Sequence, residues 1–384
     1  MKTKARVIAF YLPQFHPVPV NDKYWGKGFT EWTNVAKAKP IFKGHYQPRI
    51  PADLGFYDLR IPEVREEQAR LAREAGVEGF CYWTYWFGNG EKILEMPLGE
   101  LLKTKKPDYP FCIGWGNHDW SNKTWEKSGR FQKDIVFLKQ KYLGVEDYTA
   151  YFNYLLPAFK DKRYMTVDGK PIFYIYDPEA IPREEEKLFL ETFRKLAKQE
   201  GFEDMYFVGR ADPMAHIVVG KQKEQLAEAK KRYDEMIKRG YDAVNSVSFR
   251  RAEVVAEGVS KRIRMKIGKL ITGSEKQMYD YGKIMDNYYM EEDRLDYVHP
   301  QLVPGKDRSP RSGKNARIYT DSTPEKFRKS VREAVECVKD KPFEHRLLFL
   351  NSWNEWGEGA YIEPDLKYGH GYLDALRAEI EETD

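Results

Sequence analysis

The sequence predicts an α/β protein with a (β/α)8 TIM barrel, which is a closed ring of eight parallel strands with a helix after each strand. Two observations lead to this prediction. Short apolar runs typical of buried strands alternate along the chain with segments of helical periodicity. The chain has 384 residues, the length of one large α/β barrel. The alternative is a doubly wound open sheet, which normally has a glycine-rich loop after its first strand, and residues 13–16 are Pro-Gln-Phe-His instead.

The elements follow from the local pattern. We expect strands at 7–11, 78–82, 111–115, 171–176, 205–209, 242–247, 297–303 and 346–351. Helices are expected at 62–75, 91–102, 148–159, 183–199, 223–238, 275–289, 324–339 and 371–381, with a basic stretch at 250–269. Pro62 fits the first turn of its helix, where its missing N–H has no partner to lose. Long loops follow the first strand (12–60) and the third, and residues 1–384 are expected to form a single catalytic domain.

Composition limits the kinds of partner. Lys and Arg number 64 and Asp and Glu 60, a balance that argues against nucleic acid, which needs a concentrated basic surface. The three cysteines, Cys81, Cys112 and Cys337, look like buried free thiols, typical of a reducing compartment. No apolar run reaches the roughly 20 residues that span a bilayer. We therefore expect no membrane span and a cytoplasmic location.

Tryptophans gather at the ends of particular strands. All 9 lie at or just beyond the end of the first, second, third or eighth expected strand, and these strands are neighbours in a closed barrel. Some of them could simply pack loops onto the rim of the barrel. An aromatic cleft explains the whole set better, because flat sugar faces stack on aromatic rings. The residues are Trp25 and Trp32, Trp83 and Trp86, Trp115, Trp120 and Trp125, and Trp353 and Trp356.

Two carboxylates follow the last strand. Glu355 and Glu358 lie three residues apart between tryptophans and glycines, at a strand end that reads as the edge of an active site. A carboxylate pair is the usual equipment for breaking or forming a glycosidic bond, so we predict both as catalytic. The predicted substrate contacts are Tyr11, His16, Trp25, Glu31, Trp32, Asn34, Tyr82, Tyr85, Trp86, Trp115, Asn117, Trp120, Trp353, Asn354, Trp356 and Glu363.

Other chemistries have weaker support. His16, His45 and His118 do not have the spacing of zinc ligands, and His118-Asp119 would bind a divalent ion only with partners that the sequence does not reveal. Patterns for a serine nucleophile elbow or a phosphate-binding loop are absent from the sequence. We therefore expect no metal and no cofactor.

Four motifs resemble the WbsX-like family, which is found in bacterial surface-polysaccharide gene clusters and is often labelled glycosyltransferase. They are FYLPQFH (10–16), WGKGFTEWTNV (25–35), GFCYWTYWF (79–87) and WNEWGEG (353–359), and the resemblance extends over essentially the whole chain. The family is related to the endo-α-mannosidases of glycoside hydrolase family 99. Those relatives are retaining, metal-free (β/α)8 enzymes.

The resemblance implies roles for the glutamates. Glu355 would deprotonate the substrate 2-hydroxyl, whose oxygen attacks the anomeric carbon and forms a 1,2-anhydro sugar. Glu358 would protonate the leaving group and then activate water, which requires a raised pKa. Direct attack by a carboxylate is the alternative retaining route. The chain departs from the family pattern at 115–120 (WGNHDW) and 304–308 (PGKDR), and we expect Lys306, Arg308 and Arg311 to form a solvated basic loop, although they could meet an acidic sugar.

Three functions follow from these expectations. The first is a retaining endo-acting glycoside hydrolase, or transglycosylase, that acts on a bacterial oligo- or polysaccharide. The second is a glycosyltransferase of capsule or O-antigen biosynthesis that uses an activated sugar donor. The third is a catalytically silent glycan-binding barrel.

Overall fold

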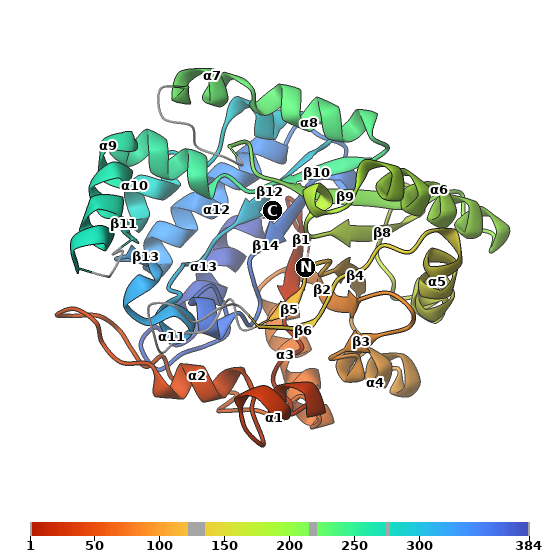
Figure 1. Cartoon of the computed structure of the whole chain (residues 1–384), viewed down its shortest axis with the longest axis horizontal. Coiled ribbons are helices and arrows are strands. Elements are labelled where there is room, and N and C mark those ends of the chain that lie inside the picture. Colours follow the sequence, from red (N-terminus) through yellow and green to blue (C-terminus); the bar gives the residue numbers. More distant parts are fainter. Residues whose placement is uncertain (1, 122–134, 215–220, 273–276, 383–384) are drawn as a thin grey trace.

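The computed structural model describes residues 2–121, 135–214, 221–272 and 277–382. A closed barrel of eight parallel strands forms its centre (Figure 1). Neighbouring strands follow the order β1-β2-β4-β8-β9-β10-β12-β14, and β14 pairs with β1 to close the ring. This confirms the predicted (β/α)8 barrel. The strands are β1 (Arg6–Tyr11), β2 (Val77–Trp86), β4 (Phe111–Trp115), β8 (Lys170–Ile175), β9 (Tyr206–Ala211), β10 (Ala243–Ser246), β12 (Val298–Leu302) and β14 (Leu347–Leu350).

The strands are apolar along their length because both of their faces are covered. Every residue of β1, β4 and β14 is buried, the pattern of parallel strands with side chains inside the barrel and helices outside. The Phe10 ring packs 5.5 Å from Phe349 and 4.8 Å from Tyr174, measured between ring centroids. The barrel interior is therefore a packed core and not a pore.

Helices surround the barrel where the sequence predicts most of them. In α12 (Pro324–Val338), Phe327, Val331, Ala334 and Val338 are all buried at the spacing of one helix face. The other helices that follow barrel strands are α3 (Pro62–Glu74), α4 (Met96–Thr104), α5 (Val145–Phe159), α6 (Arg183–Gln199), α7 (Gln222–Ala227), α8 (Ala229–Lys238), α9 (Phe249–Thr272), α10 (Tyr281–Met285) and α13 (Gly371–Ile380).

The helix predicted at 275–289 is wrong in its first part. Gln277–Asp280 forms strand β11, which pairs in parallel with β13 (Arg317–Thr320) beside the barrel. Tyr279 and Tyr319 are buried in a small second core with Phe249 of α9. This tertiary packing outweighs local helix propensity, which is a weak preference.

The loops after β1 and β4 carry their own elements. The excursion after β1 contains α1 (Pro19–Trp25) and α2 (Glu31–Lys37), which Figure 1 shows in red along one edge of the molecule. The helix predicted from residue 91 starts later because β3 (Lys92–Ile93) pairs with the end of β2. After β4, the strands β5 (Trp120–Ser121) and β6 (Val136–Leu138) form an antiparallel pair.

The two ends of the described chain lie together. Thr3 forms an antiparallel bridge with Glu381, and the Lys4 amide donates to the Ile380 carbonyl at 2.8 Å. Cys81, Cys112 and Cys337 are buried free thiols, as predicted. Within the described residues, the helices are all too short or too polar to cross a membrane.

Candidate active site

A large cleft opens at the carboxyl ends of the barrel strands. It has a volume of about 1770 Å³, and residues at or beyond the carboxyl ends of all eight barrel strands line it. This end of a (β/α)8 barrel carries the active site in essentially all characterised enzymes with the fold. The cleft is therefore the candidate active site.

One side of the cleft is aromatic. The aromatic residues come from the end of β2 and from the segments that follow β1 and β4: Trp25, Trp83, Tyr85, Trp120 and Tyr142. Ring centroids of Tyr85 and Trp120 lie 5.1 Å apart with their planes inclined at 69°. Such rings offer flat apolar faces on which sugar rings stack.

The other side of the cleft is basic. Residues that follow β9, β10 and β12 form it, and in ring order β10 stands opposite β2. The Lys306 ammonium lies 4.3 Å from the centroid of the Phe249 ring, and burial lowers the pKa of Lys306 to about 8. The cationic side chains are Arg210, Arg232, Arg250, Lys306, Arg308, Arg311 and Arg317.

The glutamate pair lies in the segment after β14, and in ring order β14 stands between β12 of the basic side and β1 of the aromatic side. The chain stays attached to β1 beyond the strand end, because the Trp353 amide donates to the Phe10 carbonyl at 2.9 Å. Asn354 then clamps Leu12: its Oδ1 accepts from the Leu12 amide at 2.7 Å, and its Nδ2 donates to the Leu12 carbonyl at 3.0 Å. These bonds hold the backbone so that Glu355 and Glu358 line the cleft.

Gly357 lets a third carboxylate approach the pair from behind. A Cβ atom at this position would lie 1.7 Å from Oε1 of Glu31, so only glycine fits. Glu31 is fully buried and belongs to α2, far from Gly357 in the sequence. The glycine therefore allows the excursion after β1 to reach the glutamates.

Arg311 connects the three carboxylates. It belongs to the short helix α11 (Ser309–Ser312) after β12. Its Nε donates to Glu31 at 2.9 Å and its Nη1 donates to Glu358 at 2.9 Å, while its Nη2 donates to Glu355. Because two nitrogens of one guanidinium reach Glu355 and Glu358, both carboxylates face the same part of the cleft.

The loop that carries Arg311 is itself anchored. The Asp307 amide donates to the Glu358 carbonyl at 2.5 Å, and the Asp307 carboxylate accepts from the Gln47 amide group at 2.8 Å and contacts His45 at 2.8 Å. These partners outweigh the effect of burial and hold the pKa of Asp307 well below its usual range. The loop after β12 is thus fixed to both the glutamate segment and the loop after β1.

The two glutamates differ in charge state. Burial raises the pKa of Glu355 to about 7, and the charges of Glu358 and Glu31 add to this, while Arg311 opposes it. Burial acts on Glu358 too, but Arg308 at 3.2 Å, Lys306 at 3.8 Å and Arg311 at 2.9 Å outweigh it and hold the pKa of Glu358 well below its usual range. The raised pKa that the family resemblance requires of Glu358 is therefore found on Glu355.

The basic residues after β12 were expected to form a solvated loop, and this expectation is wrong. Only 11% of the Lys306 side chain and 10% of the Arg311 side chain are exposed, and both line the cleft with Arg308. They turn inward because Glu358 attracts them. The sequence could not reveal this, since it does not show which acidic side chain lies opposite the loop.

Some predicted residues do line the cleft. Besides the glutamates, these are Trp25, Tyr85, Asn117 and Trp120. Asn117 has its amide committed to the Asp177 backbone, with bonds of 2.7 and 2.8 Å, so it positions the loop after β8. The remaining predicted contacts do not line the cleft: Tyr11, His16, Glu31, Trp32, Asn34, Tyr82, Trp86, Trp115, Trp353, Asn354, Trp356 and Glu363.

Several of these residues form a buried network under the glutamate segment. Glu363 accepts hydrogen bonds from Trp356 at 2.6 Å, from Gln68 at 2.7 Å and from Tyr57 at 2.9 Å. Tyr11 donates to Gln68 at 2.6 Å. Burial raises the pKa of Glu363 to about 7. These residues hold the segment in place and do not face the cleft.

The tryptophans outside the cleft have structural partners. Trp115 packs on Phe189 with ring centroids 4.9 Å apart, and Trp86 stacks on Tyr151 at 4.9 Å. Trp32 packs on Trp356 at 5.3 Å. They pack the loops onto the barrel, which is the alternative interpretation of the tryptophan pattern. Trp125 lies outside the described residues.

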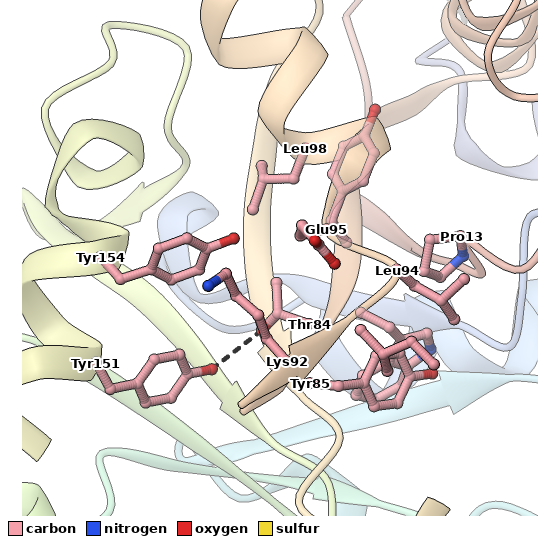
Figure 2. Close-up of a pocket in the computed structure, with 12 residues that line it drawn as sticks. Pro13, Thr84, Tyr85, Lys92, Leu94, Glu95, Leu98, Tyr151 and Tyr154 are labelled. Carbon is pink, nitrogen blue, oxygen red and sulfur yellow. Dashed lines mark hydrogen bonds between the residues drawn. The ribbon is translucent and has the colours of Figure 1, made fainter. Parts of the chain in front are cut away.

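Tyr82 lines a separate small cavity beside the cleft. Figure 2 shows this cavity with Thr84 and Tyr85 of β2 on one side and Tyr151 and Tyr154 of α5 on the other. The hydroxyls of Thr84 and Tyr151 lie 3.1 Å apart. Tyr85 lines both spaces and thus separates them.

The prediction missed several residues that line the cleft. Gln14 has an Nε2 without a hydrogen-bond partner among the described residues, and Tyr176, Arg210 and Phe249 follow β8, β9 and β10. Position alone could have pointed to the last three, because each stands at or just beyond the end of an expected strand. The ends of these three strands carry no tryptophan, which is the residue type on which the predicted cleft was based.

His118 and Asp119 do not act together as ligands in this structure. His118 lines the cleft, and burial lowers its pKa to about 4. Asp119 pairs with Lys139 at 2.8 Å. In the part of the chain that the structure describes, no three His, Cys, Asp or Glu side chains stand close enough to hold a metal ion.

Comparisons with known proteins agree with this picture of the fold. The family described as Glycosyltransferase WbsX matches residues 7–376. Two proteins named WxcX, both termed uncharacterized, from Xanthomonas campestris pv. campestris are 34% identical over 379 residues (strain B100) and 33% identical over 377 residues (strain ATCC 33913). Each alignment covers 98% of this chain and 50% of the relative, so the chain spans about half the length of the curated relatives it matches.

Solved structures resemble this one over nearly their full length. A glycoside hydrolase-like protein has a TM-score of 0.60 at 16% identity, with 100% of this chain and 95% of that chain covered. The GH99 endo-alpha-mannosidase from Bacteroides thetaiotaomicron has a TM-score of 0.53 at 15% identity, with 98% and 97% covered. At such identities the likeness establishes the fold alone.

Proposed function

The chain belongs to the WbsX glycosyltransferase family, and on this premise we propose that it is a carbohydrate-active enzyme that breaks glycosidic bonds with retention at the anomeric carbon. Its substrate would be an oligo- or polysaccharide, and the acceptor would be water or a second sugar. The single observation that carries the proposal is the pair Glu355 and Glu358, which share Arg311 at one end of an aromatic-lined cleft. The structural likeness to an endo-alpha-mannosidase supports the same class of chemistry.

The different charges of the two glutamates suit this chemistry. Retaining glycosyl transfer needs one group that donates a proton to the leaving oxygen and one ionised group that generates the nucleophile. Glu355, with a pKa of about 7, fits the donor, and Glu358, held ionised by three cations, fits the base. This assignment exchanges the roles that the family resemblance implies.

The proposed steps balance as follows. Glu358 takes the proton of the 2-hydroxyl, whose oxygen attacks the anomeric carbon while the bond to the leaving oxygen breaks, and Glu355 gives its proton to that oxygen. A 1,2-anhydro sugar results. In the second step Glu355, now ionised, takes a proton from water or an acceptor hydroxyl that attacks the anomeric carbon, and Glu358 returns its proton to the 2-oxygen. Direct attack by Glu358 would need the same charge states.

A turnover screen tests the proposal. Wild type, Glu355→Gln and Glu358→Gln would be incubated with α-mannans and with capsular and O-antigen oligosaccharides, and proton NMR would follow the anomer that is released. We expect a retained product from the wild type alone. Full activity of either variant would contradict the proposal, and a consistently inverted product would contradict the mechanism.

An activated substrate separates the two roles. A nitrophenyl glycoside of the sugar that the screen identifies needs no proton on its leaving group. The variant that lacks the acid should therefore still release nitrophenol in a first burst, and we expect this of Glu355→Gln. A burst from Glu358→Gln instead would restore the roles that the family resemblance implies.

The second candidate is a glycosyltransferase that uses an activated sugar donor, and the name of the family favours it. It predicts binding of sugar nucleotides, which calorimetry with a donor panel measures. Binding of a donor together with transfer to an acceptor would support it over hydrolysis. Binding of glycans without any turnover would instead point to a silent glycan-binding barrel.

A further inference from the structure

Three arginines surround one aspartate on the basic side of the cleft. Arg210 ends β9, Arg232 lies in α8 and Arg250 lies in α9, and all three line the cleft with Asp212. The Nε of Arg250 lies 3.5 Å from the Asp212 carboxylate, and burial raises the pKa of Asp212 while the charges of the three arginines oppose the rise. We call Arg210, Arg232 and Arg250 the arginine cluster. Among the described residues, Asp212 forms an ion pair with Arg250 of this cluster and with neither of the other two arginines.

The donors of the arginine cluster are largely unused. Arg210 stacks over Tyr176 at 4.9 Å, and neither it nor Arg232 has a hydrogen-bond acceptor or an ion pair among the described residues. The Nε of Arg232 is buried without a hydrogen-bond partner among the described residues. Arg250 contacts Asp212 only at 3.5 Å, beyond a good hydrogen bond.

Neighbouring arginines of the same cleft behave differently. Arg183 pairs with Glu179 at 2.7 Å and with Glu186 at 3.3 Å, and Arg239 pairs with the same two glutamates. The remaining charged groups that line this part of the cleft are Asp177, Glu228, Lys231 and Glu235. Among the described residues, the guanidinium groups of Arg210 and Arg232 have no ion pair, and this distinguishes the arginine cluster from Arg183 and Arg239. Burying a polar donor without a partner costs free energy, so such donors commonly serve a ligand.

We propose that the arginine cluster binds an oxyanion, either a carboxylate or a phosphate, carried by the saccharide that enters the cleft. A guanidinium presents parallel N–H donors that match two oxygens of such a group, which a neutral hydroxyl cannot do. This inference rests on the proposed function, because it takes the ligand of the cleft to be a saccharide. It narrows the substrate to acidic or phosphorylated sugars.

The cluster and the glutamate pair act on different parts of this ligand. In ring order β12 separates β10 from β14, so the arginine cluster and the glutamates occupy separate places along the rim. The oxyanion is therefore carried by a part of the ligand away from the bond that reacts. A uronic acid carboxylate and a sugar-linked phosphate both satisfy this requirement.

Calorimetry with simple probes tests the binding site directly. The probes are glucuronate, a uronic acid hexasaccharide, inorganic phosphate and a uridine diphosphate sugar, with methyl glucoside as the neutral comparison. We expect at least one anionic probe to bind the wild type, and its affinity to fall roughly tenfold or more in Arg210→Gln and in Arg232→Gln. The probe that binds identifies carboxylate or phosphate as the source of the oxyanion.

Arg183→Gln is the matched control, because Arg183 lines the same cleft but is paired with glutamates. It should bind the anionic probe as the wild type does. Circular dichroism and the unfolding temperature of each variant would confirm that it is folded. Absence of binding by all four anionic probes, or an equal loss in Arg183→Gln, would overturn the inference.

The two proposals can fail separately. Glu355→Gln should lose turnover but still bind the anionic probe. If the wild type binds the probe but turns over no glycan, the arginine cluster stands and the proposed enzyme does not. If it turns over neutral glycans and binds no anionic probe, the enzyme stands and the arginine cluster has no ligand of this kind.

Discussion

Arg311 is the residue on which the charge of the candidate site depends, because three carboxylates share its guanidinium. Without it, Glu31, Glu355 and Glu358 would repel one another in a buried setting. With it, the guanidinium fork fixes the direction in which each carboxylate points. A residue from the loop after β12 thus positions a pair from the loop after β14.

Replacing Arg311 tests this role. We expect Arg311→Met to lower the free energy of unfolding by about 3–5 kcal/mol, because it leaves buried carboxylates without their cation. Turnover of Arg311→Met should fall roughly 100-fold, because the glutamate pair is misplaced. The turnover of Arg311→Lys should lie between those of the wild type and Arg311→Met. Urea denaturation and kcat/KM measure these effects.

Arg60 offers a control for the loss of an arginine. Its side chain is 61% exposed and pairs with the nearby Asp58. Arg60→Met should change stability by less than about 0.5 kcal/mol. Equal stability of Arg311→Met and Arg60→Met would contradict the proposal that Arg311 stabilises the buried carboxylates.

Glu355 should make stability depend on pH. Its pKa is about 7 when folded, against 4.5 for an ordinary glutamate, so the folded chain keeps a proton that the unfolded chain releases. The contribution of this group is therefore complete below about pH 4.5 and is lost as pH rises through about 7. As pH rises across this range, Glu355→Gln should become more stable relative to the wild type by on the order of 3 kcal/mol in unfolding free energy.

Urea denaturation at several pH values measures this shift. Taking the difference between the two proteins removes other titrating groups, such as His118, whose pKa is lowered to about 4 and acts in the opposite direction. If Glu355 is the acid, kcat/KM of the wild type should also fall above about pH 7. Parallel stability curves for variant and wild type would mean that Glu355 ionises normally.

The residue types in the sequence pointed to the candidate site but did not identify which side chains line the cleft. Trp353 and Trp356 flank the glutamates in the sequence, yet both are fully buried. Trp353 packs on Phe80 of β2, and Trp356 packs on Trp32 and Tyr361. Trp120 and Tyr85 do reach the cleft. A large aromatic residue serves a core and a sugar site equally well, so composition cannot separate the two uses.

At the scale of elements, the short turn Trp356–Glu358 depends on a glycine. A side chain on Gly357 would collide with Glu31, which is fixed by Arg311 and cannot move into open space. We expect Gly357→Ala to destabilise the protein by about 2 kcal/mol or more and to reduce turnover. Thermal unfolding and kcat/KM measure the two effects.

Gly99 provides the matched control in α4. A Cβ atom there would have no atom within 4 Å, and the helix itself favours alanine. Gly99→Ala should stabilise the protein by about 0.5–1 kcal/mol and leave turnover unchanged. A neutral Gly357→Ala would mean that Glu31 does not need its present position.

Elements that pair within the barrel were predictable, and those that pair outside it were not. The barrel strands are buried on both faces, so each leaves a continuous apolar run in the sequence. The strands β11 and β13 read differently, as Gln-Met-Tyr-Asp and Arg-Ile-Tyr-Thr, and each is stabilised by the other. A short strand whose partner is 40 residues away carries no local signal.

At the scale of the whole molecule, the ring order explains the two-sided cleft. The end of β2 and the segments after β1 and β4 bring the aromatic side chains, and the end of β9 and the segments after β9, β10 and β12 bring the cationic ones. The fold was predictable because eight strand–helix units leave few closed arrangements. Which loops turn toward the cleft depends on contacts such as Asp307 with His45, which join segments far apart in the chain.

The last helix tests whether residues 1–384 form one cooperative unit, as the sequence predicts. Leu376 of α13 is fully buried in the main core beside the barrel, whereas Leu366 is 66% exposed. Leu376→Ala should lower the unfolding free energy by about 2–5 kcal/mol and Leu366→Ala by less than about 0.5 kcal/mol.

Tryptophan fluorescence reports mainly on the cleft end of the barrel, and far-ultraviolet circular dichroism reports on all helices. Because the closed barrel couples the two, both signals should shift to one common midpoint in Leu376→Ala. Separate midpoints would mean that α13 unfolds independently and that the chain is not a single domain.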